Sequence, residues 1–216
     1  MNIAEKIYGK IEKHAMKICF VLAVALAVLI TTAVCQRTDA AEQTALQTHL
    51  AQEVLRFHVL ANSDSDEDQE LKLQVRDAVL AYMQENMPDE NSADAVKDWI
   101  RAHIDEIEDA SRSVIAENGA DYPVSAAVTT CWFPDKSYGD VTFPAGNYEA
   151  LRIEIGEARG HNWWCVLYPG LCFMDTVNAV VPDEGKEQLK NVLTEEEYSR
   201  ITADTDFKIS WFFWQK

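Results

Sequence analysis

Cysteine and histidine are the side chains of this sequence best suited to chemistry, as a nucleophile and its base or as metal ligands. His161 and Cys165 are four residues apart in a segment that alternates as a strand does, which places them on one face but about 13 Å apart. His58 could approach Cys131 or Cys165 across a sheet, although a lone histidine on a strand more often has a structural role. Cys131 lies in an apolar stretch, which favours a small buried hydrophobe over a reactive thiol.

Other catalytic and metal-binding signatures are missing from the sequence. It contains no serine elbow, phosphate-binding loop, dinucleotide fingerprint or zinc spacing. Asp64, Asp66 and Asp68 alternate like the opening of a calcium loop, but Gln69 and Val75 occupy the positions that require glycine and glutamate. Capping of a following helix explains these carboxylates better. We therefore predict no catalytic residue, no metal site and no cofactor.

Two cysteines flank a predicted turn. Cys165 and Cys172 lie on either side of Tyr168-Pro169-Gly170-Leu171, where proline and glycine suit the central positions of a type II turn. The turn brings its two arms together, so in an oxidising compartment we predict a disulfide between Cys165 and Cys172, with Cys131 left over. A regular two-residue hairpin would place Leu167 opposite Cys172, so the backbone must deviate to close the bridge.

The first 35 residues have the pattern of an export leader or a short membrane anchor. Four lysines precede an uncharged run from Ile18 to Val34, which as a helix spans roughly 25 Å, at the short end for crossing a hydrocarbon core. Small residues between Ala33 and Ala41 suit a processing enzyme, which favours a cleaved leader over a retained anchor. We assign residues 1–35 to a signal peptide or membrane anchor, 36–52 to a polar tether and 53–216 to a single acidic domain.

The charge balance limits the partners of that domain. The chain has 19 basic and 36 acidic side chains, of which four and two lie in residues 1–35, so 15 and 34 remain and their net charge is −19. Such a charge repels nucleic acid and anionic lipid. We predict no nucleic-acid partner and membrane contact only through the N-terminal segment.

Hydrophobic periodicity predicts an α+β fold, with a mainly antiparallel sheet and two or three packed amphipathic helices. In strand 54–61, Leu55, Phe57 and Val59 face the core and Arg56 and His58 the other side, so this strand is expected to be half-buried. The loop 156–160 is short enough to join antiparallel neighbours directly. The remaining strands are predicted at 124–133, 148–155, 162–168 and 207–214, and the helices between residue 68 and Pro88, between Ser92 and Asn118, and over 183–201.

Aromatic residues gather on two of these strands. Trp163-Trp164 and the run Trp211-Phe212-Phe213-Trp214 put large rings on both strand faces. One face must be core. The other is covered by a helix, or else it contacts a partner or a membrane interface.

Two stretches carry a specific combination of motifs. Residues 55–79 read LRFHVLANSDSDEDQELKLQVRDAV and residues 144–173 read PAGNYEALRIEIGEARGHNWWCVLYPGLCF. The first contains ANSD-x-x-x-DQ and VRD, and the second contains G-x-NWWC-V-x-x-P-x-LC. Together they strongly resemble the stage II sporulation protein R family, whose members also have a signal-like leader.

The resemblance implies a signalling protein of endospore-forming bacteria that is not an enzyme. It implies synthesis in the forespore and export into the space between the two membranes of the sporangium. There the protein would act on a membrane-embedded aspartic protease of the mother cell, which then cleaves the pro-sequence from a mother-cell sigma factor. Two other classes stay open, a secreted hydrolase acting on the cell wall and a binding module for a membrane surface.

The family has no catalytic residues to carry over. As receptor contacts we select polar and aromatic side chains in the two matching stretches that strand alternation leaves off the core. These candidates are Arg56, His58, Asn62, Asp64, Asn162, Trp163 and Trp164. Their alternative role is to stabilise the fold by hydrogen bonds and packing.

Overall fold

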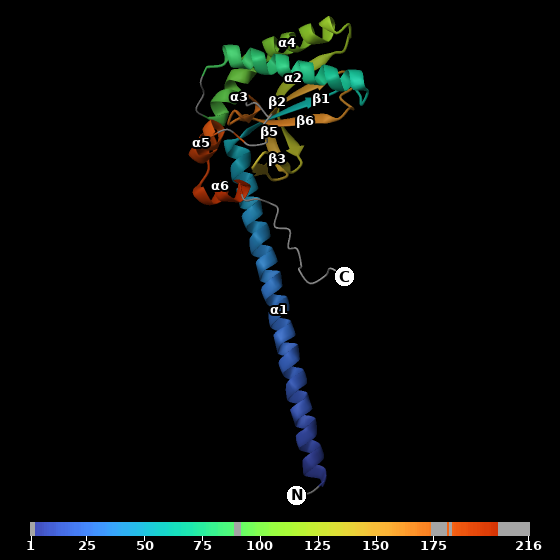
Figure 1. The fold of residues 1–216 in the computed structure, drawn as a ribbon, viewed down its shortest axis with the longest axis vertical. Coiled ribbons are helices and arrows are strands. Elements are labelled where there is room, and N and C mark those ends of the chain that lie inside the picture. Colours follow the sequence, from blue (N-terminus) through green and yellow to red (C-terminus); the bar gives the residue numbers. More distant parts are fainter. Residues whose placement is uncertain (1–2, 89–91, 174–180, 182, 203–216) are drawn as a thin grey trace, which may run out of the picture. The chain divides into compact units, whose positions relative to one another are not determined.

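The structure is a computed structural model that describes residues 3–88, 92–173, 181 and 183–202. The chain divides into two compact units, residues 1–46 and 47–216. Figure 1 shows the elements, which are α1 (Ile3–Glu53), β1 (Leu55–Leu60), α2 (Asp66–Asn86), α3 (Ala93–Ala102), α4 (Ile104–Glu117), β2 (Val124–Phe133), β3 (Lys136–Tyr138), β4 (Val141–Phe143), β5 (Gly146–Ile155), β6 (Asn162–Tyr168), the 3₁₀ helix η1 (Leu171–Phe173), α5 (Asp183–Val192) and α6 (Glu195–Thr202).

The first unit is the N-terminal part of α1. Its side chains are exposed from residue 17 to residue 45. Within the described residues, α1 is the one helix long and apolar enough to cross a membrane, and its position near the N-terminus fits a signal or an anchor. The predicted tether, residues 36–52, is a continuation of this helix, and its last turns from Gln47 belong to the second unit, where Leu50 is buried.

The second unit is built on a four-stranded sheet in the order β2-β5-β1-β6. β1 is parallel to β5 and antiparallel to β6, and β2 is antiparallel to β5. The predicted α+β class and mainly antiparallel sheet are therefore confirmed. The prediction that loop 156–160 joins neighbouring strands is wrong, because β1 lies between β5 and β6. Leu60 of β1 is in register with Glu154 on one side and with Asn162 on the other.

Helices α2, α3 and α4 cover one face of the sheet (Figure 1). Helix α2 begins after the N-cap Ser65, whose hydroxyl accepts the Asp68 N–H, and it ends before Pro88 as predicted. Its apolar stripe joins the core of the unit, together with Phe57 and Val59 of β1. This stripe consists of Leu71, Val75, Val79 and Met83.

The single helix predicted after Ser92 is two helices, α3 and α4, which meet at His103. The His103 backbone has φ −120° and ψ 26°, and its ring Nδ1 lies 2.8 Å from the Trp99 carbonyl oxygen. A side chain that bonds a nearby carbonyl offers the backbone an alternative to the helix. The sequence did not reveal the break because apolar residues continue at helical spacing from Val96 to Ile115.

Strand β1 is buried along its whole length, so the prediction of a half-buried strand is wrong. The cause is a second, two-stranded sheet of β3 and β4, whose three-residue strands are too short to produce a clear alternation. Tyr138 of β3 and Phe143 of β4 lie over the Arg56 side of β1.

The chain after β6 also differs from the prediction. The Tyr168–Pro169 peptide is cis, and Leu171–Phe173 form η1 rather than the second arm of a hairpin. The helix predicted at 183–201 is two helices, α5 and α6, because Thr194 starts a new one. Its Oγ1 accepts the Glu197 N–H, and Glu197 Oε2 accepts the Thr194 N–H, which is a capping box. The strand predicted at 207–214 lies outside the described residues.

Candidate functional site

The two motif stretches meet at one end of the sheet, where β1 and β5 end and β6 begins. Residues 61–64 and 156–161 form a hydrogen-bonded pair of loops that we call the loop cluster. Gly160 donates its N–H to the Ala61 carbonyl oxygen (3.0 Å), and Arg159 donates to the Asn62 carbonyl oxygen (3.2 Å). The Asn62 side-chain oxygen accepts the Glu157 N–H at 2.9 Å. Residues almost a hundred positions apart are thus held by backbone bonds.

Two glycines allow this close approach. Gly156 has φ +59°, a left-handed conformation that glycine adopts without steric cost. A Cβ atom at Gly156 would overlap the Asn62 side chain, and one at Gly160 would overlap the Ser63 backbone. Gly156 and Gly160 are therefore explained by packing against the first motif stretch.

The acidic residues of the first motif act largely within the fold. Asp68 Oδ2 accepts hydrogen bonds from Asn62 Nδ2 (2.8 Å) and Ser63 Oγ (2.5 Å). Burial alone would raise the pKa of Asp68, but the hydrogen bonds from Ser63 and Asn62 outweigh it, so this pKa is lowered. Asp68 therefore stays ionised at neutral pH and anchors the start of α2 to the loop cluster.

Two basic residues of α2 connect the motifs further. Lys72 Nζ donates to Gln69 Oε1 at 2.6 Å and to the His161 carbonyl oxygen at 3.1 Å. The Arg76 guanidinium lies 5.0 Å from the centre of the Trp163 ring, a cation–π contact. Sequence reasoning missed both residues as parts of the site. Their spacing on α2, four positions apart, was the signal that they share a face.

The exposed part of the loop cluster is an Asp64–His161 pair. Asp64 Oδ1 accepts the His161 backbone N–H and lies 2.5 Å from the His161 ring Nδ1. The hydrogen bond from the His161 side chain lowers the pKa of Asp64. The two side chains are 55% and 80% exposed, so this hydrogen-bonded pair is available to solvent and to a partner.

Arg56 occupies a different environment, inside an aromatic enclosure. Its guanidinium carbon lies 4.4 to 5.9 Å from the ring centres of Phe133, Phe143, Tyr148 and Tyr138. Arg56 Nε donates to the Cys165 carbonyl oxygen (3.0 Å) and Nη2 to the Tyr138 hydroxyl (3.1 Å). Within the described part of the chain, Nη1 has no hydrogen-bond partner. The side chain therefore ties β1 to β6 and to the β3-β4 sheet, and no carboxylate among the described residues pairs with it.

His58 lies beside Arg56 and approaches Cys131. Of the two thiols that the sequence offered to His58, Cys131 and Cys165, it is therefore the first that lies near the ring. The His58 Nδ1 and Cys131 Sγ atoms are 3.8 Å apart, and the imidazole stacks on Trp164 with 3.8 Å between ring centroids. Burial lowers the pKa of His58 to about 4, with the Asn162 side chain acting in the opposite direction. Burial also raises the pKa of Cys131. At neutral pH this pair is a thiol and a neutral imidazole, not the thiolate and imidazolium of an activated nucleophile.

Cys165 and Cys172 are both free thiols in the structure. The Cys172 thiol donates to the Val166 carbonyl oxygen at 2.9 Å. Burial raises the pKa of Cys172 well above its usual value, and a hydrogen bond with the Cys165 side chain acts in the same direction. The two side chains are therefore neighbours, and the disulfide stays a prediction. Among the described residues there is no group of three or more His, Cys, Asp or Glu that could hold a metal ion.

The seven predicted contact residues fall into three groups by exposure. Arg56 and His58 are 0% and 4% exposed, so the premise that strand alternation leaves them off the core is wrong, because the β3-β4 sheet and Trp164 cover that face. Asp64 and Asn162 are exposed. Asn62, Trp163 and Trp164 are half-buried. The contacts themselves stay predictions.

Comparison with known proteins gives one consistent match. The family model for "Stage II sporulation protein R (spore_II_R)" matches residues 51–178. Stage II sporulation protein R of Bacillus subtilis (strain 168) is 39% identical over 156 residues, which cover 71% of this chain and 69% of that protein. No solved structure matches. The region matched by the family model contains the whole loop cluster and the Arg56 enclosure.

Proposed function

This chain belongs to the stage II sporulation protein R family, and from that premise we propose that it is an exported sporulation signal that activates a membrane-embedded aspartic protease of the mother cell. The activated protease then processes the precursor of a mother-cell sigma factor. Family membership gives the chain a role in sporulation. The observation that supports export is the exposed apolar stretch of α1 ahead of the compact second unit.

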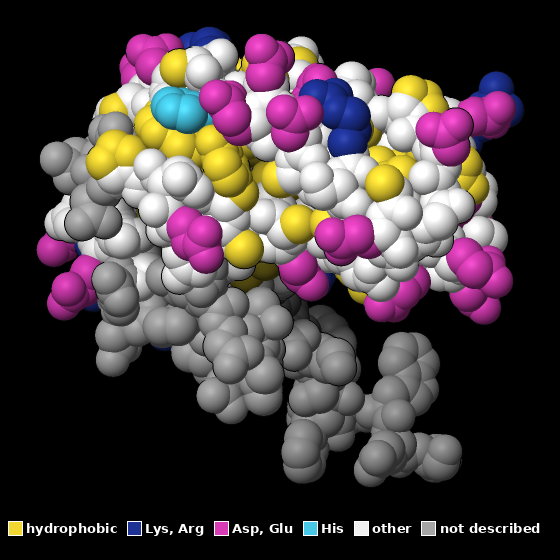
Figure 2. Space-filling view, turned by 90° about the horizontal axis from the view of Figure 1, so that it is seen from above, with side chains coloured by type: hydrophobic (Ala, Val, Ile, Leu, Met, Phe, Trp, Pro, Cys, Tyr) yellow, Lys and Arg dark blue, Asp and Glu magenta, His cyan; other side chains and the backbone are white. Residues whose placement is uncertain are grey.

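The surface of the second unit is consistent with a protein ligand for the outer side of a membrane. Figure 2 shows Asp and Glu side chains spread over the face seen from above, with few Lys or Arg among them. Such a surface disfavours binding to anionic lipid, which the proposed ligand does not need. The exposed Asp64, His161 and Asn162 at the loop cluster offer polar contacts to a receptor.

To activate the protease, the second unit needs only a higher affinity for the active state of the protease than for its inactive state. If the second unit binds the outward face of the protease more tightly in its active or dimeric state, it shifts the protease population towards that state. No covalent step by this chain is needed. A protonated thiol at Cys131 and a neutral His58 are compatible with such a role.

Co-expression with the protease and the sigma-factor precursor tests the proposal. Three forms are compared: the full chain, residues 36–216 alone, and residues 36–216 behind an unrelated cleavable export signal. The readout is conversion of the precursor on a gel. We expect conversion with the first and third forms and none with the second, because the signal must act across the membrane. Conversion driven by the cytosolic form, or by none of the three, would contradict the proposal.

The cysteine pair offers a test that distinguishes the proposed signal from the alternative, a secreted hydrolase that acts on the cell wall. We propose that Cys165 and Cys172 form a disulfide after export. Replacing both (Cys165→Ser with Cys172→Ser) should then lower the free energy of unfolding of the oxidised protein by roughly 2–3 kcal/mol and leave the reduced protein much less affected. A hydrolase that uses Cys165 as nucleophile would instead lose turnover and keep its stability. Denaturant unfolding with and without reductant distinguishes the two.

A further inference from the structure

Strand β2 is an edge strand of the main sheet, and its outer side can be identified from two hydrogen bonds. β2 pairs only with β5. The Pro123 carbonyl oxygen accepts the Gly156 N–H, so odd-numbered residues here point their peptide groups towards β5. The Ala126 N–H instead donates to Glu108 Oε1 on α4 at 2.9 Å, so even-numbered residues point outward.

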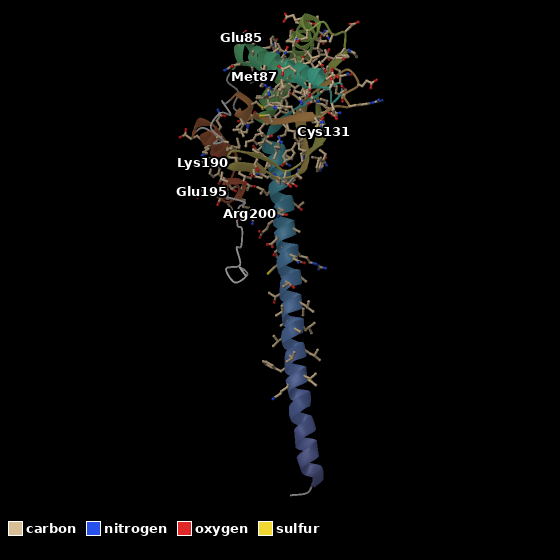
Figure 3. The ribbon with its side chains drawn as sticks, turned by 45° about the vertical axis from the view of Figure 1, so that its right-hand side comes forward. Glu85, Met87, Cys131, Lys190, Glu195 and Arg200 are labelled. Carbon is tan, nitrogen blue, oxygen red and sulfur yellow. The ribbon has the colours of Figure 1, made fainter. Side chains whose placement is uncertain are left out.

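Beyond Ala126, the described residues leave this outer side open. In the described ranges, no backbone or side-chain group pairs with the outward N–H groups of Val128, Thr130 and Trp132. Helices α5 and α6 do not reach it, since Cys131 of β2 lies on the other side of the unit from Lys190 and Glu195 in Figure 3. The opposite edge, β6, is closed in part by η1, because the Cys172 thiol donates to the Val166 carbonyl oxygen.

The composition of β2 leaves the edge unprotected. Soluble proteins commonly blunt an edge strand with lysine, proline, a bulge or an inward charge. The ten residues Val124–Phe133 contain no charge and no proline, and they pair with β5 in an unbroken register. Trp132 is 58% exposed, and it is the one exposed large hydrophobic side chain that the described part of the second unit presents.

We propose that the free edge of β2 is a docking strand, to which an extended segment of the activated protease adds by β-strand pairing. This mode supplies affinity through backbone hydrogen bonds and specificity through alternate side chains. The segment would pair with Val128, Thr130 and Trp132 and cover the Trp132 ring. The identity of the partner rests on the proposed function. The open edge is an observation on β2 and does not depend on that function.

Charge selects the chemistry of the incoming segment. The uncharged edge belongs to a strongly acidic unit, since residues 36–216 carry a net charge of −19. A β-prone segment with Lys or Arg at its ends matches this charge. A second copy of this chain matches poorly, because it brings the same strongly acidic unit to the contact.

A proline at the open edge tests the pairing. Thr130→Pro removes an outward N–H that no described residue uses, and an edge strand tolerates proline at such a position. Thr130→Ala is the matched control, with a small side chain and the N–H kept. In the co-expression assay we expect Thr130→Ala to support precursor conversion like the parent and Thr130→Pro to reduce it at least tenfold, with both exported and both unfolding at similar temperatures. Equal conversion by the two variants would overturn the proposal.

Crosslinking keeps the test decisive if Thr130→Pro does not fold. Trp132 is replaced by p-benzoylphenylalanine, with the same replacement at the exposed Ser113 of α4 as control. We expect a light-dependent adduct with the protease from position 132 and not from position 113. An adduct with a second copy of the chain, or no adduct, overturns the inference. Conversion by the parent without an adduct would leave the proposed function standing, and an adduct without conversion would reject that function alone.

Discussion

Arg56 is a buried cation whose environment is aromatic and dipolar rather than anionic. Its two hydrogen-bond acceptors and four neighbouring rings suit a planar guanidinium, and they suit a compact, strongly hydrated ammonium poorly. We therefore expect Arg56→Lys to lower the free energy of unfolding by roughly 3 kcal/mol. Arg56→Met, which removes the charge and keeps the apolar stem, should cost less.

Urea unfolding of the two Arg56 variants checks this order. A smaller loss in Arg56→Lys than in Arg56→Met would show that a positive charge, rather than the shape of the guanidinium, is what the enclosure stabilises. The sequence indicated none of this, because the rings come from four different strands and only the tertiary fold brings them together.

His58 makes the stability of the unit depend on pH. Its folded pKa of about 4 lies below the unfolded value of 6.5, so the fold favours the neutral ring. This preference adds roughly 3 kcal/mol to the free energy of unfolding above pH 6.5. The added stability is lost as the pH falls towards 4. His58→Phe keeps a ring against Trp164 and removes the titration. Urea unfolding at several pH values should show a flatter profile for the variant over this range, and parallel profiles would refute the assignment.

Several motif residues could be predicted from the sequence while their roles could not. The capping function of the Asn62–Asp68 region was predictable because capping is local, and Ser65 fulfils it as the N-cap of α2. The bond from Asn62 to Glu157 and the pair of Asp64 with His161 join residues more than ninety positions apart. Long-range contacts of this kind leave no periodic signal in one sequence, so Asn62 and Asp64 were predicted as receptor contacts, which remain untested.

At the scale of elements, the start of α2 shows how much one cap contributes. The Ser65 hydroxyl accepts the Asp68 N–H at 3.2 Å, and loss of such a cap costs about 1 kcal/mol. Ser65→Ala should therefore destabilise the protein by about that amount. Ser113→Ala is the matched control, because the Ser113 hydroxyl only donates to the Asp109 carbonyl oxygen on the exposed face of α4. Chemical denaturation that gives equal losses for both variants would exclude a capping role for Ser65.

The elements divide into those with strong local signals and those without. β2 and β6 have the predicted bounds, since alternation and flanking turn residues are local properties. The strand order was not predictable, because the parallel pairing of β1 with β5 joins segments separated by three helices and three other strands. The β3-β4 sheet was missed for its short strands, and it is the element that buries the Arg56 side of β1.

At the scale of the whole molecule, the apolar N-terminal stretch and the acidic folded unit serve different purposes. Residues 17–45 of α1 are exposed, so they contribute little to the core of the second unit. The last turns of α1 are different: Leu50 is fully buried, Gln47 Nε2 donates to the Asn147 carbonyl oxygen at 3.0 Å, and His49 Nδ1 lies 2.9 Å from Glu197 Oε1. The segment first interpreted as a tether therefore contains part of the fold.

This division predicts where the chain can be cut. Soluble chains beginning at Gln36 and at Glu42 should unfold with free energies that agree to within about 0.5 kcal/mol, as expected for loss of residues 36–41, which are all exposed. A chain beginning at Val54 loses the buried Leu50 and both polar contacts, and it should be less stable by roughly 3 kcal/mol. Urea denaturation of the three chains measures the differences. Equal stability of the Val54 chain, or a steady loss between Gln36 and Glu42, would show that the folded unit does not begin between Glu42 and Val54.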